Sequence, residues 1–276
     1  MRIGLIQMAP FYGEGSITRR TVDANLEKSC ELIDRAAQRG PAALCFPEFS
    51  FSGPVSLIEH LDDVADTIPG RITDCLGEKA RQHGLYVATN LLEKGKEGYF
   101  NAAVLIGPEG RLLLRYRKVH LYPTERFLAS GREFPVCKTP LGGVGLLVCY
   151  DLAFPEAAGF LAARGAKIIF CPTMALDRTL ALLKHCARAR AVENGIFLIV
   201  VNMVGYFPVG DEHADGKSFL VHPTGRVTQF GPGERIFLSR VNMREIDELK
   251  EYWSPFEDRQ QFLYGRLMSG PKAEES

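Results

Sequence analysis

The chain has 276 residues, of which 46% are hydrophobic and 24% are charged, a composition typical of a globular protein. Lysine plus arginine equals aspartate plus glutamate at 33 each, so the formal net charge is zero. The longest basic run, Arg115-Tyr-Arg-Lys118, is too short to indicate a surface for nucleic acid or an anionic membrane. No apolar run approaches the roughly 18 residues of a spanning helix. We therefore expect no nucleic-acid partner and no membrane insertion.

Cysteine usage indicates a reducing compartment. Seven cysteines are spread along the chain, an odd number, and no two are spaced as Cys-x-x-Cys. Neither a disulfide framework nor a structural zinc site is therefore expected. The six histidines form no metal-binding pattern such as His-Glu-x-x-His. These features predict a cytoplasmic protein without a bound metal.

Short apolar segments recur along the chain, as is typical of strands that are covered on both faces. The expected strands lie at residues 3–7, 42–46, 85–89, 102–106, 112–116, 145–148, 167–170, 197–201, 218–221 and 236–241. Gly107-Pro-Glu-Gly110 and Pro223-Thr-Gly225 each fit a hairpin turn between two of these strands.

Helical patterns lie between the strands. Apolar residues recur at helical spacing over residues 22–33, and Gly40-Pro41 ends that helix. Another helix begins at Pro155, because proline suits a first helical turn. A further helix follows Asp177 and ends at Asn194-Gly195, a C-terminal glycine signal. Strand–helix–strand units combined with hairpins predict mixed sheets with helices outside.

The domain organisation is expected to be simple. No linker, low-complexity tract or charge block interrupts the chain before its last ten residues. One domain over residues 1–268 is the simplest interpretation, and the polar residues 269–276 are expected to form a flexible C-terminal tail.

Two segments resemble each other internally. Ala43-Leu-Cys-Phe-Pro47-Glu48 and Ile168-Ile-Phe-Cys-Pro172-Thr173 are both apolar strands that end at a proline. Two similar halves packed sheet to sheet would produce this pattern, although two short segments do not establish a repeat.

Three polar residues follow apolar strands directly. Glu48 comes after Phe46-Pro47, Lys118 after residues 112–117, and Cys149 after residues 144–148. In layered α/β folds, reactive groups gather beyond the carboxyl ends of strands, where loops leave room for a ligand. These three residues are therefore candidates for chemistry.

Each candidate also has an ordinary structural interpretation. Cys149 becomes a nucleophile only with a base or a positive neighbour, and otherwise fits a buried structural cysteine. Glu48 lies among aromatic residues that would raise its pKa toward that of a general base, yet it also fits a helix cap or a surface carboxylate. Lys118 offers a cation for an oxyanion, or is a surface lysine. Taken singly, none of the three is specific.

Their local sequences closely resemble the three signatures of the nitrilase superfamily, the carbon–nitrogen hydrolases that include amidases, carbamoylases and nitrilases. The matching segments are Phe46-Pro47-Glu48, Tyr116-Arg117-Lys118-Val119-His120-Leu121 and Cys149-Tyr150-Asp151-Leu152-Ala153-Phe154-Pro155-Glu156. The stretches Arg188-Ala-Arg190-Ala-Val-Glu193-Asn194 and Gly216-Lys-Ser218 are also similar to this family. The motifs span nearly the whole chain in a compatible order, which makes their coincidence specific.

The resemblance implies an α/β fold, namely a four-layer αββα sandwich with two mixed β-sheets. It also implies that Glu48, Lys118 and Cys149 form a Glu–Lys–Cys triad. A second glutamate usually follows the lysine motif in this family. Glu125 is the best match, although Glu133 lies nearby.

The resemblance implies a cysteine-dependent hydrolase of a non-peptide carbon–nitrogen bond that converts an amide to a carboxylate and ammonia. Glu48 would take the proton of Cys149, and the thiolate would form a thioester that water hydrolyses with help from Glu125. Lys118 would stabilise the oxyanion. No metal or organic cofactor is needed. The residues expected to bind the substrate or its oxyanion are Tyr150, Phe154 and Met174.

Two positions bear on the substrate. Nitrilases commonly have Cys-Trp-Glu at the nucleophile, whereas this chain has Cys149-Tyr150-Asp151, which resembles the amidase and carbamoylase branches. Members similar to ω-amidases often carry an arginine where this chain has Ala153, and that arginine is expected to bind a substrate carboxylate. A neutral or modestly apolar linear amide is therefore favoured.

Several alternatives stay open. The chain could hydrolyse N-carbamoyl (ureido) compounds or nitriles, transfer the acyl group to an amine, or be a catalytically silent scaffold of the same fold. A metal-dependent phosphoesterase would need clustered Asp, His and Asn ligands, which the sequence does not show. A homodimer or higher homo-oligomer is expected from the family. The aromatic stretch Tyr252-Trp253-Ser-Pro255-Phe256 fits either such an interface or packing onto its own domain.

Overall fold

The computed structural model describes residues 1–11, 17–206 and 213–260. The tail predicted at residues 269–276 and the end of the predicted domain lie outside these described residues. None of the helices in the described part of the chain is long and apolar enough to cross a membrane.

The first sheet has six strands and is mixed. Its central strands β1, β2 and β3 are parallel, while β14, β4 and β5 pair antiparallel to their neighbours. Its strands, in spatial order, are β14 (Arg235–Arg240), β1 (Arg2–Gln7), β2 (Ala43–Cys45), β3 (Tyr86–Gly95), β4 (Gly98–Ile106) and β5 (Leu112–Arg117).

The second sheet repeats this plan. It also has six strands, with β7, β8 and β9 parallel at its centre and antiparallel strands at both edges. Its strands, in spatial order, are β13 (Val227–Gln229), β12 (Phe219–Val221), β9 (Phe197–Asn202), β8 (Ile168–Thr173), β7 (Gly142–Leu146) and β6 (Val136–Thr139). A separate ribbon pairs β10 (Val204–Tyr206) with β11 (His213–Asp215).

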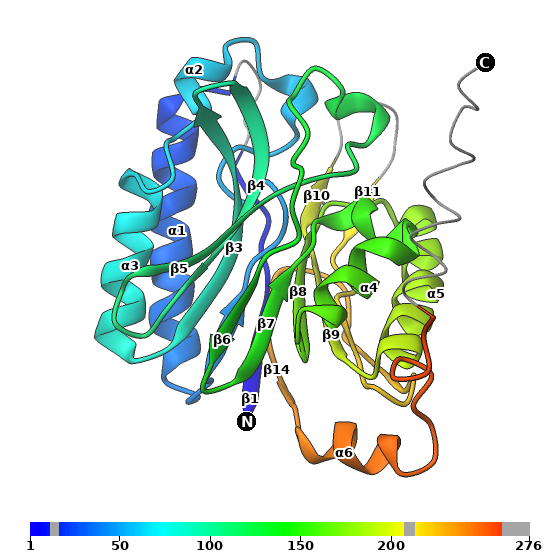
Figure 1. The fold of residues 1–276 in the computed structure, drawn as a ribbon. Helices are drawn as coiled ribbons and strands as arrows, with labels where there is room; N and C mark the ends of the chain where they lie inside the picture. The colour runs from blue at the N-terminus through cyan, green and yellow to red at the C-terminus, as the bar shows by residue number, and fades with distance from the viewer. Residues whose placement is uncertain (12–16, 207–212, 261–276) are drawn as a thin grey trace, which may run out of the picture.

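Helices cover the outer face of each sheet. Figure 1 shows α1 (Arg19–Ala37) and α3 (Arg71–His83) outside the first sheet, and α4 (Pro155–Ala163) and α5 (Asp177–Asn194) outside the second. The two sheets face each other between these helical layers, so the predicted αββα sandwich with two mixed sheets is confirmed. Shorter helical segments are η1 (Val55–Leu57), α2 (Leu61–Val64), η2 (Pro123–Glu125), η3 (Cys149–Ala153) and α6 (Arg244–Lys250).

Alternation along the strands builds two hydrophobic clusters. Leu5 of β1 and Cys45 of β2 belong to a cluster that joins the first sheet to the second sheet and to α4 and α5. Their neighbours Ile6 and Leu44 point the other way, into a cluster shared with α1 and α3. Because side chains alternate between the faces of a strand, one apolar run serves both layers.

The helices predicted from glycine and proline signals are confirmed. Helix α1 ends at Ala37, α4 begins at Pro155, and α5 ends at Asn194, where Gly195 takes a left-handed conformation with φ of 60°. Both predicted hairpins are confirmed as well, β4–β5 and β12–β13. Proline and glycine fix the backbone locally, so these boundaries are readable without the tertiary fold.

Three strand predictions need correction. The strand predicted at residues 102–106 begins four residues earlier, as β4 (Gly98–Ile106). The strand predicted at residues 85–89 continues to Gly95 as the long β3, which pairs with β4 along its length. The strand predicted at residues 145–148 instead covers Gly142–Leu146. It ends early because the backbone N–H of Val148 is hydrogen-bonded by the Asp151 carboxylate at 3.0 Å and not by a neighbouring strand.

Candidate active site

The ammonium of Lys118 lies buried between two carboxylates. Lys118 follows β5 directly, and its Nζ is 2.8 Å from Oε1 of Glu48 and 2.7 Å from Oε2 of Glu125. All three side chains are almost fully buried. A buried charge is tolerated only when it is paired and hydrogen-bonded, and here the pairing is double.

The mutual arrangement sets the pKa of each group. Burial raises the pKa of Glu48 to about 7, with the charge of Lys118 opposing this rise and that of Glu125 adding to it. Burial works against the charged form of Lys118, but the two carboxylates outweigh it and hold the Lys118 pKa well above its usual range. Glu48 can therefore exchange a proton near neutral pH, whereas Lys118 stays a cation.

Two asparagines that the sequence interpretation missed orient the carboxylates. Asn101 of β4 donates from Nδ2 to Oε1 of Glu48 at 2.8 Å and to Oε1 of Glu125 at 2.6 Å. Its own Oδ1 accepts from Nδ2 of Asn90 of β3 at 2.5 Å, and Asn90 in turn accepts from the backbone N–H of Phe49 at 2.8 Å. The signal that the sequence offered was a single asparagine within each of two apolar strands, β3 and β4.

Cys149 stands at the start of η3 in a strained conformation. Its φ is 44°, a region that non-glycine residues occupy rarely and that often marks functional positions. The thiol contacts the carbonyl oxygen of Met174 at 3.8 Å, while the backbone N–H of Met174 donates to Oε2 of Glu48 at 2.9 Å. Met174 thus brings the sulfur and the carboxylate together from two different sheets.

The charges of Glu48 and Lys118 both act on the pKa of Cys149. Burial raises the pKa of Cys149 well above its usual value, the Glu48 charge raises it further, and the Lys118 charge lowers it. The resting sulfur is therefore a thiol. It needs a base to become a nucleophile.

Asp151 clamps the turn that carries Cys149. Its fully buried carboxylate accepts from the N–H of Val148 and the hydroxyl of Tyr116 on one oxygen, at 3.0 and 2.8 Å. The other oxygen lies 3.0 Å from the backbone N and 2.9 Å from Nδ1 of His120. Because Tyr116 and His120 flank Lys118 in sequence, this carboxylate ties the lysine segment to the cysteine turn.

Aromatic rings surround the predicted substrate residues. Tyr150 packs edge-on against both Phe154 and Tyr122, with ring centroids 5.3 Å apart in each pair. His120 stacks on Phe154 at 3.8 Å. The predicted residues Tyr150 and Phe154 therefore form one aromatic group beside Cys149.

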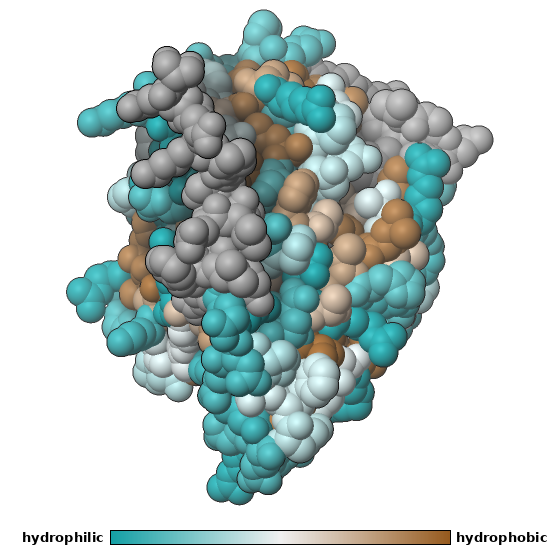
Figure 2. All heavy atoms as spheres, turned by 45° about the vertical axis from the view of Figure 1, so that its right-hand side comes forward, coloured by the Kyte–Doolittle hydropathy of each residue, from teal (hydrophilic) through white to brown (hydrophobic). Residues whose placement is uncertain are grey.

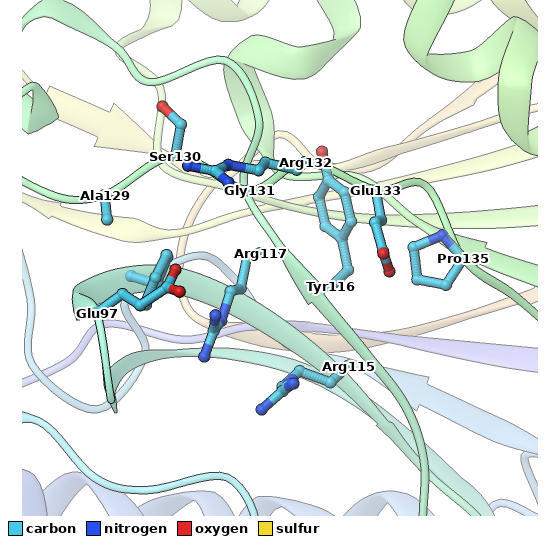
Figure 3. Close-up of a pocket in the computed structure, with 11 residues that line it drawn as sticks. Glu97, Arg115, Tyr116, Arg117, Ala129, Ser130, Gly131, Arg132, Glu133 and Pro135 are labelled. Atoms are coloured by element: carbon cyan, nitrogen blue, oxygen red, sulfur yellow. The ribbon is translucent and has the colours of Figure 1, made fainter.

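A hollow of about 670 Å³ lies along β5, lined by residues that include Arg115, Arg117 and Glu133 (Figure 3). Glu133 faces this hollow, whereas Glu125 contacts Lys118, so of the two candidate glutamates the structure brings Glu125 to the Glu48–Lys118 pair. Within the described residues, no group of three or more His, Cys, Asp or Glu side chains is placed to hold a metal ion.

The αββα sandwich with a buried Glu–Lys pair beside a cysteine turn defines the class of carbon–nitrogen hydrolases. The family description "Carbon-nitrogen hydrolase" matches residues 2–251. The chain belongs to this family, as the motifs predicted.

Individual relatives agree with the family match. Omega-amidase NIT2-B of Xenopus laevis is 30% identical over 87% of this chain and 91% of its own length. An (R)-stereoselective amidase of a Pseudomonas species is 30% identical over 98% of this chain and 96% of its own length.

Solved structures show the same fold. A carbon–nitrogen hydrolase from Helicobacter pylori G27 has a TM-score of 0.86 at 23% identity, covering 97% of this chain and 98% of that one. An amidase from a Nesterenkonia species has a TM-score of 0.79 at 27% identity, covering 97% and 96%.

The role of Asp151 can be tested by Asp151→Asn, which keeps the shape but turns one acceptor oxygen into a donor facing other donors. We expect the free energy of unfolding to fall by roughly 2–4 kcal/mol, because buried donors lose their partner. We expect kcat to fall about tenfold or more, because the cysteine turn loses its anchor. Urea denaturation and steady-state kinetics measure the two effects. Asp247→Asn, at an exposed position on α6, is the control. Equal unfolding free energies and equal kcat for the two variants would show that Asp151 does not hold the cysteine turn.

Proposed function

We propose that this carbon–nitrogen hydrolase cleaves linear amides to a carboxylate and ammonia, with Cys149 as nucleophile, Glu48 as general base and acid, and Lys118 as the oxyanion's cation. The observation that carries this proposal is the convergence at Met174, whose carbonyl contacts the thiol while its N–H fixes Glu48. The amidase names of several relatives support the reaction class.

In the acylation step, Glu48 takes the proton of Cys149 and the sulfur attacks the amide carbon. The oxygen that gains charge is stabilised by Lys118 and the backbone N–H of Tyr150; one such donor is worth roughly a hundredfold in rate. Protonated Glu48 then gives its proton to the leaving nitrogen, the carbon–nitrogen bond breaks, and ammonia departs. A thioester remains on Cys149.

In the deacylation step, Glu48 accepts a proton from water, which attacks the thioester carbon. The carbon–sulfur bond breaks, the acid product leaves and ionises to the carboxylate, and Glu48 returns its proton to the Cys149 sulfur. Glu125 helps to position this water, because its carboxylate shares Asn101 and Lys118 with Glu48. Covalent chemistry at a cysteine is known in a related amidase, since structures of the Nesterenkonia amidase mutant carry acrylamide or an acetamide moiety on the active site cysteine.

The direct test is Cys149→Ala, assayed for ammonia release on amide, ureido and nitrile substrates. We expect turnover to disappear on all of them, because the thioester can no longer form. Cys137→Ala, on strand β6, is the matched control and is expected to keep full activity. Mass spectrometry of the wild-type protein should trap an acyl adduct on Cys149. Ammonia release that survives Cys149→Ala would refute the proposal.

The pKa of Glu48 predicts the pH dependence. Below about pH 7 the carboxyl is protonated and cannot accept the thiol proton, so kcat/KM should rise with pH through an apparent pKa of about 7. Glu48→Gln is expected to lose most activity, and its residual kcat/KM should no longer rise with pH through about 7. Glu133→Gln, in the hollow along β5, should retain this rise of kcat/KM with pH. A flat wild-type profile between about pH 5 and pH 9 would contradict the assignment of the base.

Ala153 and Lys118 together favour an uncharged acyl group. Lys118 is shared between two carboxylates, and Ala153 offers no cation of its own. Burying a substrate carboxylate without a partner is costly. The proposed substrates are therefore neutral or modestly apolar linear amides, which differ from the activity in the name of the omega-amidase relatives.

Substrate choice is tested by comparing butyramide with succinamate, which differ in the distal carboxylate. We expect kcat/KM to favour butyramide by about tenfold or more, because the charged end finds no partner. Ala153→Arg should reduce the ratio of kcat/KM for butyramide to kcat/KM for succinamate, and Ala153→Leu is the control for side-chain size. Comparable kcat/KM for both substrates in the unaltered protein would overturn the preference.

Homo-oligomerisation and a reducing, cytoplasmic location remain part of this proposal. Phe160, Leu182, Tyr252 and Trp253 are large apolar residues exposed on α4, α5 and the segment after α6. Figure 2 shows hydrophobic patches among hydrophilic ones on the face turned forward. Such patches favour a second copy as partner. All seven cysteines are free, as a reducing compartment would keep them.

A further inference from the structure

A pair of thiols lies on the outer side of the first sheet, away from Cys149. Cys30 of α1 and Cys75 of α3 have their sulfur atoms 3.4 Å apart. The two helices run side by side on the outer face of the first sheet (Figure 1). A disulfide bond is about 2.04 Å long, so the sulfurs need to approach by only about 1.4 Å.

Ion pairs on both sides hold the two thiols in register. Toward the N-terminal end of both helices, Arg71 contacts Asp23 at 2.6 Å. Toward their C-terminal ends, Asp34 accepts from Lys79 at 2.6 Å and lies 2.7 Å from Nε2 of His83. The helices therefore cannot slide past each other without breaking these contacts, and the cysteines stay opposite one another.

The two thiols differ in their surroundings. The ammonium of Lys79 interacts electrostatically with Cys30, but this effect is smaller than that of burial. The two cysteines differ in access, because Cys30 is buried and Cys75 is half-buried. Burial and the contact with Cys75 raise the pKa of Cys30 to about 12. Because Cys75 is the more exposed of the two, it is the thiol that meets a reagent first.

We propose that Cys30 and Cys75 form a redox-modification site that a peroxide closes to a disulfide, independently of the amidase site. The Cys75 thiolate attacks one peroxide oxygen, the O–O bond breaks, and a sulfenic acid and water are formed. The Cys30 sulfur then attacks the Cys75 sulfur, the S–O bond breaks, and the hydroxide leaves as water with the Cys30 proton. Two thiols lose two electrons in total, the peroxide becomes two waters, and a dithiol reductant reverses the change.

Closure would staple α1 to α3. The bond links residues that are 45 positions apart, and a cross-link over such a loop restricts the unfolded chain. Because the helices lie on the outer face of the first sheet and the proposed catalytic groups lie beyond the ends of its strands, the cross-link changes stability and leaves the geometry around Lys118 as it is.

The test treats the full-length protein with hydrogen peroxide, at a concentration that is raised until Cys186 is also oxidised. Digestion without reductant and mass spectrometry should then find a peptide pair joined through Cys30 and Cys75, about 2 Da lighter than the two thiol peptides. The oxidised protein should melt roughly 5 °C higher, and dithiothreitol should restore the original Tm. Recovery of Cys30 and Cys75 on separate peptides at that dose would overturn the proposal.

Two variants separate this site from general cysteine oxidation. Cys75→Ser should abolish both the joined peptide and the rise in Tm. If that variant folds poorly, Cys30→Ala serves in its place and should have the same two effects. Cys186→Ser, a half-buried cysteine on α5, should keep both effects. A joined peptide in which Cys30 or Cys75 pairs mainly with a different cysteine would also refute the site. None of these measurements depends on turnover.

Discussion

The buried ammonium of Lys118 is the interaction on which the site depends. Moving one cation and two carboxylates out of water is costly, and the cost is offset only because each charge has fixed partners. With both carboxylates ionised the group would carry a net negative charge, since Lys118 neutralises only one of them. Burial raises the pKa of Glu48 to about 7 against the opposing charge of Lys118, and the negative charge of Glu125 adds to the rise. A carboxyl group that exchanges a proton near neutral pH is thus a consequence of burying this ion group.

Each sheet supplies a different half of that chemistry. The first sheet delivers Glu48 beyond β2 and Lys118 beyond β5, whereas the second delivers Cys149 and Met174 beyond β7 and β8. The two halves meet where the backbone N–H of Glu48 donates to the carbonyl of Thr173 at 3.4 Å. The internal resemblance in the sequence therefore lies at the two strand exits that touch, but the expected stop at proline holds only for the first: β2 ends at Cys45, before Pro47, whereas β8 continues through Pro172 to Thr173. Pro172 stays within the ladder between β8 and β9, and at this second exit the chain leaves its sheet only after Thr173.

Much of the fold and of the site could be predicted because the relevant signals are local. Continuous apolar strands, the proline that begins α4 and the motif around Cys149 are all readable from short windows. Helix α3 was missed, and its Gly77 shows why: a Cβ there would lie 2.5 Å from the carbonyl oxygen of Gly110, so close packing demands a residue that weakens the helical pattern. Asn101 was missed for a similar reason. Its partners Glu48 and Glu125 are far from it in sequence, and only the fold unites them.

Burial alone does not decide which cysteine can react. Cys45, Cys149 and Cys171 are all buried, and burial raises the pKa of each thiol above its usual value. Cys45 and Cys171 lie within apolar strands of the core, where a thiol behaves as a small hydrophobe. Cys149 differs because it sits on a strained turn, with a titratable carboxylate and a permanent cation beside it. In the proposed mechanism this carboxylate removes the proton at the moment of attack, so the sulfur stays a thiol until a substrate arrives. Reactivity therefore follows from what surrounds the sulfur, and the clamp at Asp151 and the ion group around Lys118 provide those surroundings.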